Sequence, residues 1–194
     1  WQKGLGGEAG FGSIVLGPRA VSRLESYKPD RAIPRIFRLA KDKKVNFDLF
    51  NGALINTPSI ICLEEFYDNL IWCDNLGGIS ALVQKVEENY DVFKKRILLQ
   101  NKFRFLVDEK YRSHHIVCLD VASDRYQSLS RKDKRDFLKR IVEICEQEKA
   151  GFDFLGHKLT EPHLRIWTGP TVESQNLEKF LSWLEFAHDR AMLS

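Results

Sequence analysis

The residues best suited to chemistry stand at the first positions of the sequence. Lys3 follows Gln2 and precedes a glycine-rich stretch at positions 4–7. A lysine amine forms a Schiff base with an aldehyde cofactor only when it is deprotonated. Lysine ordinarily ionises near pH ~10.4, so such a lysine needs a site that buries it or sets a cation beside it. Glycines let the backbone approach a ligand closely. The alternative is a solvated lysine at a frayed chain end.

Two further groups have the chemistry to bind anions. Asn56 and Thr57 stand where an apolar, helix-like segment begins. They either cap that helix or, with the same geometry, hold a phosphate at its N-terminal N–H groups. Arg165 lies in a short apolar, strand-like segment, where a buried guanidinium needs a partner. That partner is either a structural carboxylate or a bound ligand carboxylate held by two hydrogen bonds.

The apolar patterns indicate how these residues are positioned. Helices alternate with strands, which predicts an α/β or α+β fold. Ser130 and Asp133 have the spacing of a capping box, so a helix is expected to follow Ser130. The other helices are expected over residues 18–24, 56–75, 79–97 and 171–192. Strands are expected over residues 11–16, 33–39, 103–107, 115–121, 152–155 and 164–167.

Composition excludes several classes of function. The 194 residues are 43% hydrophobic, enough for one ordinary domain and part of a second. A net charge of +3 with scattered basic residues argues against nucleic acid as a partner. The chain has no apolar run long enough to span a membrane and no visible signal peptide.

The cysteines and histidines do not predict a metal site. The four cysteines lack metal-ligand spacing and are predicted to be buried free thiols, which is typical of the cytoplasm. His114 and His115 would point to opposite faces of a strand, so a structural role is expected for both. His163 is interpreted as a loop residue.

Several segments together resemble the phosphoserine aminotransferase family. The segments are Trp1-Gln2-Lys3 with Leu5-Gly6-Gly7-Glu8, Ile14–Leu16, Pro18–Val21, Ile55–Ser59 and Leu164–Trp167. The resemblance implies the C-terminal part of a fold-type I transferase that depends on pyridoxal 5'-phosphate (PLP). A complete member is about twice as long, so an N-terminal half is expected to be missing. Residues 1–54 would be the end of the large PLP-binding domain with its connection, and residues 55–194 the small C-terminal α/β domain.

The resemblance also implies roles for the candidate residues. Lys3 would bind the cofactor and act as the catalytic base and acid, with Gln2 at the cofactor phosphate. Asn56 and Thr57 would reach the cofactor phosphate of the other subunit, which implies a homodimer with active sites at its interface. Arg165 would bind the substrate carboxylate.

The substrate phosphate would lie near His157 and Lys158. Lys158 stands where family members often carry arginine. This chain therefore keeps the positive charge there but loses the bidentate hydrogen bonding of a guanidinium. The implied reaction moves an amino group between O-phosphoserine and 3-phosphohydroxypyruvate, with glutamate and 2-oxoglutarate as the second pair. That reaction belongs to serine biosynthesis and to pyridoxine biosynthesis.

The resemblance leaves alternatives. The 194 residues alone are expected to be inactive, because the missing half should carry further cofactor contacts. Another fold-type I aminotransferase or a desulfurase would share the lysine. A non-catalytic dimerisation domain would not depend on Lys3 at all. A nucleic-acid binder would show salt-dependent affinity.

Overall fold

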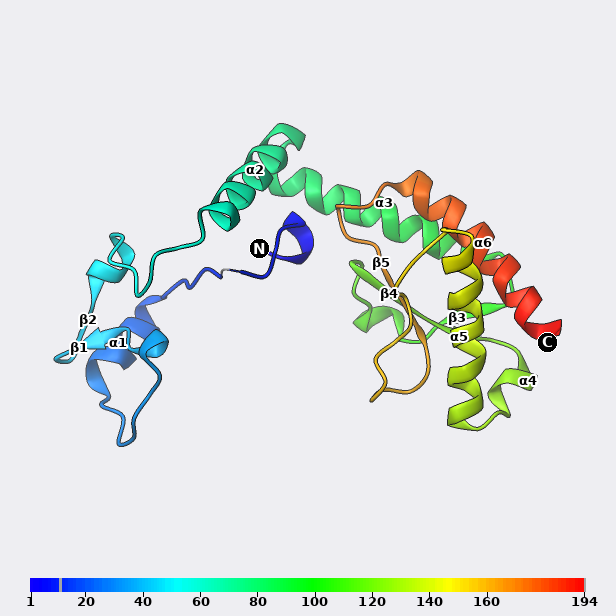
Figure 1. Ribbon diagram of the computed structural model, residues 1–194, viewed down its shortest axis with the longest axis horizontal. Coiled ribbons are helices and arrows are strands. Elements are labelled where there is room, and N and C mark those ends of the chain that lie inside the picture. Colours follow the sequence, from blue (N-terminus) through cyan, green and yellow to red (C-terminus); the bar gives the residue numbers. More distant parts are fainter. Residues whose placement is uncertain (11, 194) are drawn as a thin grey trace. The chain divides into compact units, whose positions relative to one another are not determined.

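The computed structural model describes residues 1–10 and 12–193 (Figure 1). It divides into two compact units, which are described separately below. The first consists of Trp1–Gln2 and Gly7–Asp68, and the second of Lys3–Gly6 and the chain from Asn69 onward. The predicted boundary between residues 54 and 55 concerns the domains of a larger protein and stays a prediction.

The first unit contains one short helix and a small hairpin. Helix α1 (Pro18–Ser26) begins as predicted at Pro18, which is tolerated there because the first helical N–H has no partner within the helix. Strands β1 (Ala40–Lys41) and β2 (Lys44–Val45) pair antiparallel. The two turn residues between them have positive φ, 51° and 59°, as a tight hairpin turn requires. Short 3-10 turns occupy Lys3–Leu5 (η1, in the second unit), Arg35–Phe37 (η2) and Phe47–Phe50 (η3).

Two predicted strands of this unit are wrong. Residues 12–16 form no strand, and Phe11 lies outside the described residues. The span 33–39 contains the 3-10 turn η2, and the short strand β1 follows it. Pro34 precedes that turn, and Ile36 and Phe37 are about 60% exposed. Apolar runs with β-branched residues become strands only where a neighbouring strand completes the hydrogen-bond ladder, which is not the case here.

Two consecutive helices follow. Helix α2 (Ile60–Leu76) runs from the first unit into the second. It begins at Ile60, because the Oγ of Ser59 accepts a hydrogen bond from the N–H of Cys62 at 3.4 Å, as an N-cap does. Of the two alternatives for Asn56 and Thr57, a capping role is therefore wrong. Gly77 and Gly78 have φ of 108° and 74°, and they end α2 as predicted and start α3 (Gly78–Leu98).

The core of the second unit lies between a three-stranded sheet and three helices. Strands β3 (Phe103–Phe105), β4 (Ile116–Val121) and β5 (Leu164–Trp167) are antiparallel, with β4 in the centre. Helix α6 (Ser174–Leu193) packs on α3 and on α5 (Arg131–Gln147) (Figure 1). The fully buried members of the core include Phe93, Leu119, Leu138, Ile141, Leu164 and Leu184. This mixed helix-and-sheet architecture confirms the predicted fold class.

Local capping determines where the later helices begin. The Oγ of Ser130 accepts a hydrogen bond from the N–H of Asp133 at 3.2 Å, which confirms the predicted start of α5. A short helix, α4 (Asp124–Gln127), was not predicted, and Ser123 caps it in the same way. The predicted strand 152–155 is wrong: only Leu155 forms an isolated bridge, to Leu164, and Asp153 has a positive φ of 52°. Short 3-10 turn η4 (Glu109–Tyr111) lies in the β3–β4 connection.

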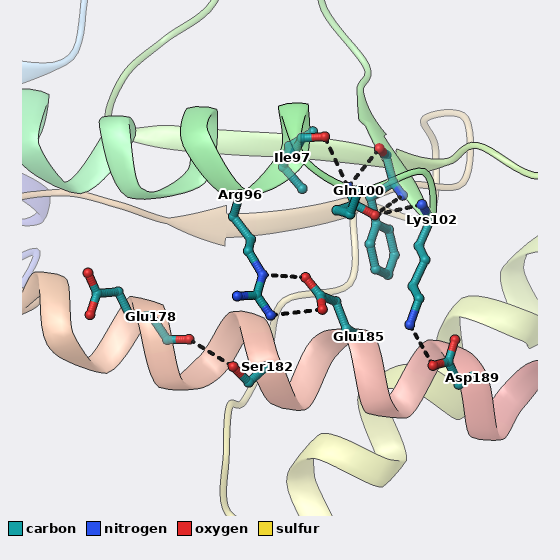
Figure 2. Close-up of polar contacts among 9 residues, drawn as sticks. Arg96, Ile97, Gln100, Lys102, Glu178, Ser182, Glu185 and Asp189 are labelled. Carbon is teal, nitrogen blue, oxygen red and sulfur yellow. Dashed lines mark hydrogen bonds and ion pairs between the residues drawn. The ribbon is translucent and has the colours of Figure 1, made fainter.

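Ion pairs join α3 and the turn that follows it to α6 (Figure 2). Arg96 binds both carboxylate oxygens of Glu185, at 2.5 and 2.9 Å, and Lys102 Nζ lies 2.5 Å from Asp189. The Gln100 side chain closes the turn into β3 by bonding the backbone of Ile97, Lys102 and Phe103. Because these pairs are partly exposed, each contributes about 1 kcal/mol or less, and the apolar core remains the main source of stability.

No helix among residues 1–10 and 12–193 has the length and apolar character to cross a membrane. The same residues contain no group of three His, Cys, Asp or Glu side chains placed to hold a metal ion. All four cysteines are free. Only Cys145 is fully buried, whereas Cys62, Cys73 and Cys118 are half-buried, so the prediction of four buried thiols is correct for one of them.

Candidate active-site residues

Lys3 lies in a constrained turn. The N–H of Gly6 donates to the carbonyl of Lys3 at 3.0 Å and closes a single 3-10 turn, Lys3–Leu5. Lys3 has a φ of 73°, a left-handed conformation that costs an L-residue roughly 1 kcal/mol. Its side chain is exposed and forms no ion pair or hydrogen bond with any residue that the structure describes. The turn thus holds a free amine on a backbone that is fixed at some cost, a combination that occurs at functional sites.

The other end of this turn is packed within the second unit, to which the turn belongs. A Cβ added to Gly6 would lie 3.0 Å from Cγ2 of Thr171, and the φ of Gly6 is 75°. Both the close approach and the positive φ favour glycine at this position. At Gly6 the chain is therefore packed against Thr171 and does not act as a flexible linker.

Gln2, Asn56 and Thr57 belong to the first unit, and all three are exposed. None of their side chains forms a hydrogen bond within the described chain. Within this unit Trp1 stacks on Phe66, with ring centroids 3.9 Å apart. Because Ser59 caps α2, the side chains of Asn56 and Thr57 are not used for capping and are free for a ligand.

Arg165 projects from β5 on the side away from the core. Leu164 and Ile166, its neighbours in the strand, are buried, while Arg165 is exposed, as the alternation of a strand requires. The expectation of a buried guanidinium is therefore wrong, and among the described residues its side chain has no ion pair or hydrogen-bond partner. Arg165 borders a cavity of about 310 Å³. Across the ladder it pairs with Cys118; burial raises the pKa of that thiol, and the charge of Arg165 partly offsets the rise.

A second cation, Arg112, lines the same cavity and was not predicted from the sequence. Its Nε donates to the carbonyl of Val107 at 2.7 Å, and its guanidinium lies 4.1 Å from the centre of the Phe105 ring. One of its nitrogens also reaches the hydroxyl of Tyr90 at 3.4 Å. Arg112 is thus a fixed part of the wall, in contrast to the unpaired Arg165. No local pattern in the sequence indicates these contacts, because all three partners lie five or more residues from Arg112.

His157 and Lys158 lie on the same hairpin as Arg165 and precede it in the chain. The N–H of Arg165 donates to the carbonyl of Phe154 at 2.7 Å, and the N–H of Gly156 donates to the carbonyl of His163 at 2.8 Å. The turn beyond Gly156 presents His157 and Lys158 to solvent. His163 is 7% exposed, so it is a buried support of this hairpin and more than a loop residue. The second unit therefore contains three of the predicted ligand residues on one hairpin.

The comparisons with known proteins agree with these observations. No family model matches the chain. A phosphoserine aminotransferase from Methanosarcina mazei is 40% identical over 190 residues, which cover 97% of this chain and 49% of that protein. The protein of the same name from Methanosarcina barkeri is 38% identical over the same share of each chain. This chain thus spans about half the length of the curated relatives it matches.

Solved structures share the fold. The phosphoserine aminotransferase from Bacillus circulans subsp. alkalophilus superposes with a TM-score of 0.57 and 21% identity, covering 73% of this chain and 36% of that one. The PLP-bound phosphoserine aminotransferase from Trichomonas vaginalis gives a TM-score of 0.58 and 17% identity, covering 71% of this chain and 36% of that one. Along nearly its whole length, this chain is therefore a homologue of the phosphoserine aminotransferase family and corresponds to about half of such a protein.

Proposed function

We propose that this chain is the C-terminal half of a phosphoserine aminotransferase, which transfers an amino group between O-phosphoserine and 2-oxoglutarate. The observation that carries the proposal is the 40% identity to the Methanosarcina mazei protein over 97% of the chain. The substrates, the cofactor and the pairing of subunits are properties of the complete protein. We expect the 194 residues alone to be inactive as an aminotransferase.

The residues present fit PLP as the cofactor. Lys3 offers an exposed, unpaired amine on a fixed turn, and Asn56 and Thr57 offer side chains that no helix cap uses. In the proposal Lys3 holds the cofactor by its Nζ and Gln2 contacts the phosphate of that cofactor, while Asn56 and Thr57 contact the cofactor phosphate of the other subunit. When bound, PLP supplies the electron sink that stabilises negative charge at the substrate α-carbon.

Lys3 would also move the proton. Its Nζ takes the proton from the substrate α-carbon and returns it at a neighbouring position, which is general base and general acid catalysis by one group. This requires an amine that is desolvated in the complete protein, because a solvated lysine is protonated near neutrality. In the described chain Lys3 is exposed, so the groups that bury it must come from outside these residues.

The substrate would be held by the hairpin that carries Arg165, His157 and Lys158. Arg165 is exposed and unpaired, so its planar guanidinium can accept the substrate carboxylate through two parallel hydrogen bonds. His157 and Lys158 would contact the substrate phosphate, with Lys158 acting as a point charge. The proposal thus explains why three polar residues are exposed on one hairpin above a well-packed core.

The remaining expectations belong to the same proposal. Contacts of Asn56 and Thr57 with the cofactor of another subunit would make the protein a homodimer with active sites at its interface. The free thiols support a cytoplasmic location, since cytoplasmic proteins keep thiols reduced. The reaction would serve serine biosynthesis and pyridoxine biosynthesis.

A substrate panel tests the proposal. The complete protein that contains this chain is loaded with PLP, and its kcat/KM is measured for O-phosphoserine, alanine, aspartate and cysteine with 2-oxoglutarate. We expect O-phosphoserine to be preferred by at least about 100-fold, because a site built to bind phosphate leaves charged groups unpaired with the other donors. Preference for an unphosphorylated amino acid, or release of sulfur from cysteine, would instead identify another enzyme of this fold.

A further inference from the structure

The loop that carries His157 and Lys158 is held by two arginines of α5. Arg131 and Arg135 lie one helical turn apart, so their side chains leave the same face of the helix. Both guanidinium groups are directed at the backbone of residues 156–160. No sequence pattern indicated these contacts, which join positions more than twenty residues apart.

The contacts converge on carbonyl oxygens. Arg135 donates from Nη1 to the carbonyl of Gly156 at 3.4 Å, and from Nη2 to the carbonyls of His157 at 3.1 Å and Thr160 at 3.4 Å. Arg131 donates from Nη2 to the carbonyls of Leu159 at 3.3 Å and Thr160 at 2.9 Å.

Arg131 has a second partner on the same loop. Its Nε lies 3.6 Å from the carboxylate of Glu161. The donors of both arginines are thus largely engaged with the loop itself. For that reason we do not assign either guanidinium as a direct ligand of an anion.

Because these carbonyls point toward α5, the direction of the neighbouring backbone N–H groups is also fixed. In a trans peptide the N–H of one residue points opposite to the carbonyl of the residue before it. The N–H groups of His157 and Lys158 therefore point away from the two guanidinium groups. Neither N–H has an acceptor among the described residues, whereas the N–H of Leu159 donates to Nδ1 of His157 at 3.3 Å.

We propose that Arg131 and Arg135 are positioning residues of the anion-binding loop. They keep its carbonyl oxygens, which would repel a phosphate, against α5, and they leave the N–H groups of His157 and Lys158 on the opposite face. This inference rests on the proposed function, because it takes the loop as the part of the site that receives the substrate phosphate.

The test separates positioning from charge. The complete, PLP-loaded protein is compared with Arg135→Gln, Arg135→Lys and Arg131→Gln, and Lys132→Gln serves as the matched control. Lys132 is exposed on the same helix, and its side chain has no contact with the loop in the described chain. KM and kcat for O-phosphoserine are measured, together with hydrogen–deuterium exchange at the amides of residues 157–161.

The inference predicts that Arg135→Gln and Arg135→Lys both raise KM by about tenfold, with kcat changed less than about twofold. Lysine keeps the charge but lacks the planar fork with which Arg135 contacts three carbonyls. The same two variants should show faster exchange at the loop amides and unchanged exchange in β4. We expect a smaller rise for Arg131→Gln and none for Lys132→Gln.

Two results would overturn the inference. Wild-type KM in Arg135→Lys would show that charge alone matters, and unchanged loop exchange in Arg135→Gln would show that the arginines do not order the loop. Failure of the proposed function has a separate signature. If Lys158→Ala and His157→Ala leave KM for O-phosphoserine unchanged, the loop does not receive the phosphate, whatever the arginines do to its exchange.

Discussion

Arg165 and Cys118 face each other across the β4–β5 ladder, and the arginine has no ion pair among the described residues. The pair lies on the side of the sheet away from the core, beside a cavity whose wall also contains Arg112. The guanidinium of Arg112 is hydrogen-bonded within the wall, whereas that of Arg165 has no hydrogen-bond partner among the described residues. A free guanidinium beside a mainly apolar cavity is suited to a small carboxylate.

Replacing Arg165 should therefore impair binding more than folding. We expect Arg165→Lys to lower kcat/KM for O-phosphoserine by about 100-fold, because lysine cannot form two parallel hydrogen bonds to a carboxylate. The melting temperature should change little, since Arg165 is exposed. Arg104→Lys is the control, because that residue also projects from the sheet but is paired with Asp120 at 2.7 Å. Full activity of Arg165→Lys would remove Arg165 from the site.

Gly156 supports the hairpin that carries His157, Lys158 and Arg165 by steric fit. A Cβ at this position would lie 2.5 Å from the His163 ring, which is buried beneath it. We expect Gly156→Ala to destabilise the fold by about 1–3 kcal/mol, the usual cost of overpacking, and to raise KM for O-phosphoserine. Urea unfolding and steady-state kinetics measure the two effects. Gly12→Ala is the control and should have the stability of the wild type, because the space around its Cβ is open. An unchanged free energy of unfolding in Gly156→Ala would show that the His163 ring does not require glycine at this position.

The N-cap of α5 should be measurable on its own. Ser130→Ala removes the acceptor for the N–H of Asp133, which should cost about 1 kcal/mol of unfolding free energy in a urea titration. Ser182→Ala in the middle of α6 is the matched control, because among the described residues the Ser182 hydroxyl makes one hydrogen bond, to the carbonyl of Glu178 at 3.5 Å. Equal losses in the two variants would show that the cap contributes nothing specific.

Asp189 should make the free energy of unfolding depend on pH in the acidic range. The hydrogen bond from Lys102 is the main cause that lowers the pKa of Asp189 below its ordinary 3.8. Burial opposes it, and the weaker hydrogen bond from His188 and the charges of both partners add to the lowering. Because the folded-state pKa is the lower one, the contribution is present above about pH 4 and is lost as pH falls through the folded-state value. Asp189 is 56% exposed, so we expect about 0.5 kcal/mol or less.

Urea unfolding at pH 6 and at pH 3 checks the dependence on Asp189. Asp189→Asn should lose stability at pH 6 and approach the wild type at pH 3. Asp91→Asn, an exposed change on α3, should follow the wild type at both values. A deficit of Asp189→Asn that is as large at pH 3 as at pH 6 would be incompatible with the ion pair.

Whether the sequence alone predicts a feature depends on how far apart the interacting residues lie along the chain. Helix α3 and the cap at Ser130 were predictable, because side chains three or four residues apart determine them. Residues 12–16 and 33–39 are apolar enough for strands, but a strand also needs a partner that local patterns do not reveal. The exposure of Arg165 was not predictable, because it depends on which face of β5 packs against the helices. Likewise, Arg112, Arg131 and Arg135 become visible only when distant segments meet.

The assignment of Lys3 as the residue that binds PLP is tested most directly by mapping the lysine that reacts with the cofactor. The complete protein is incubated with PLP, reduced with borohydride, digested and analysed by mass spectrometry, beside a Lys3→Ala variant. We expect one stoichiometric adduct, on Lys3, that is absent from the variant. An adduct that persists in Lys3→Ala, or that is spread over exposed lysines without preference for Lys3, would show that Lys3 is not the residue that binds PLP.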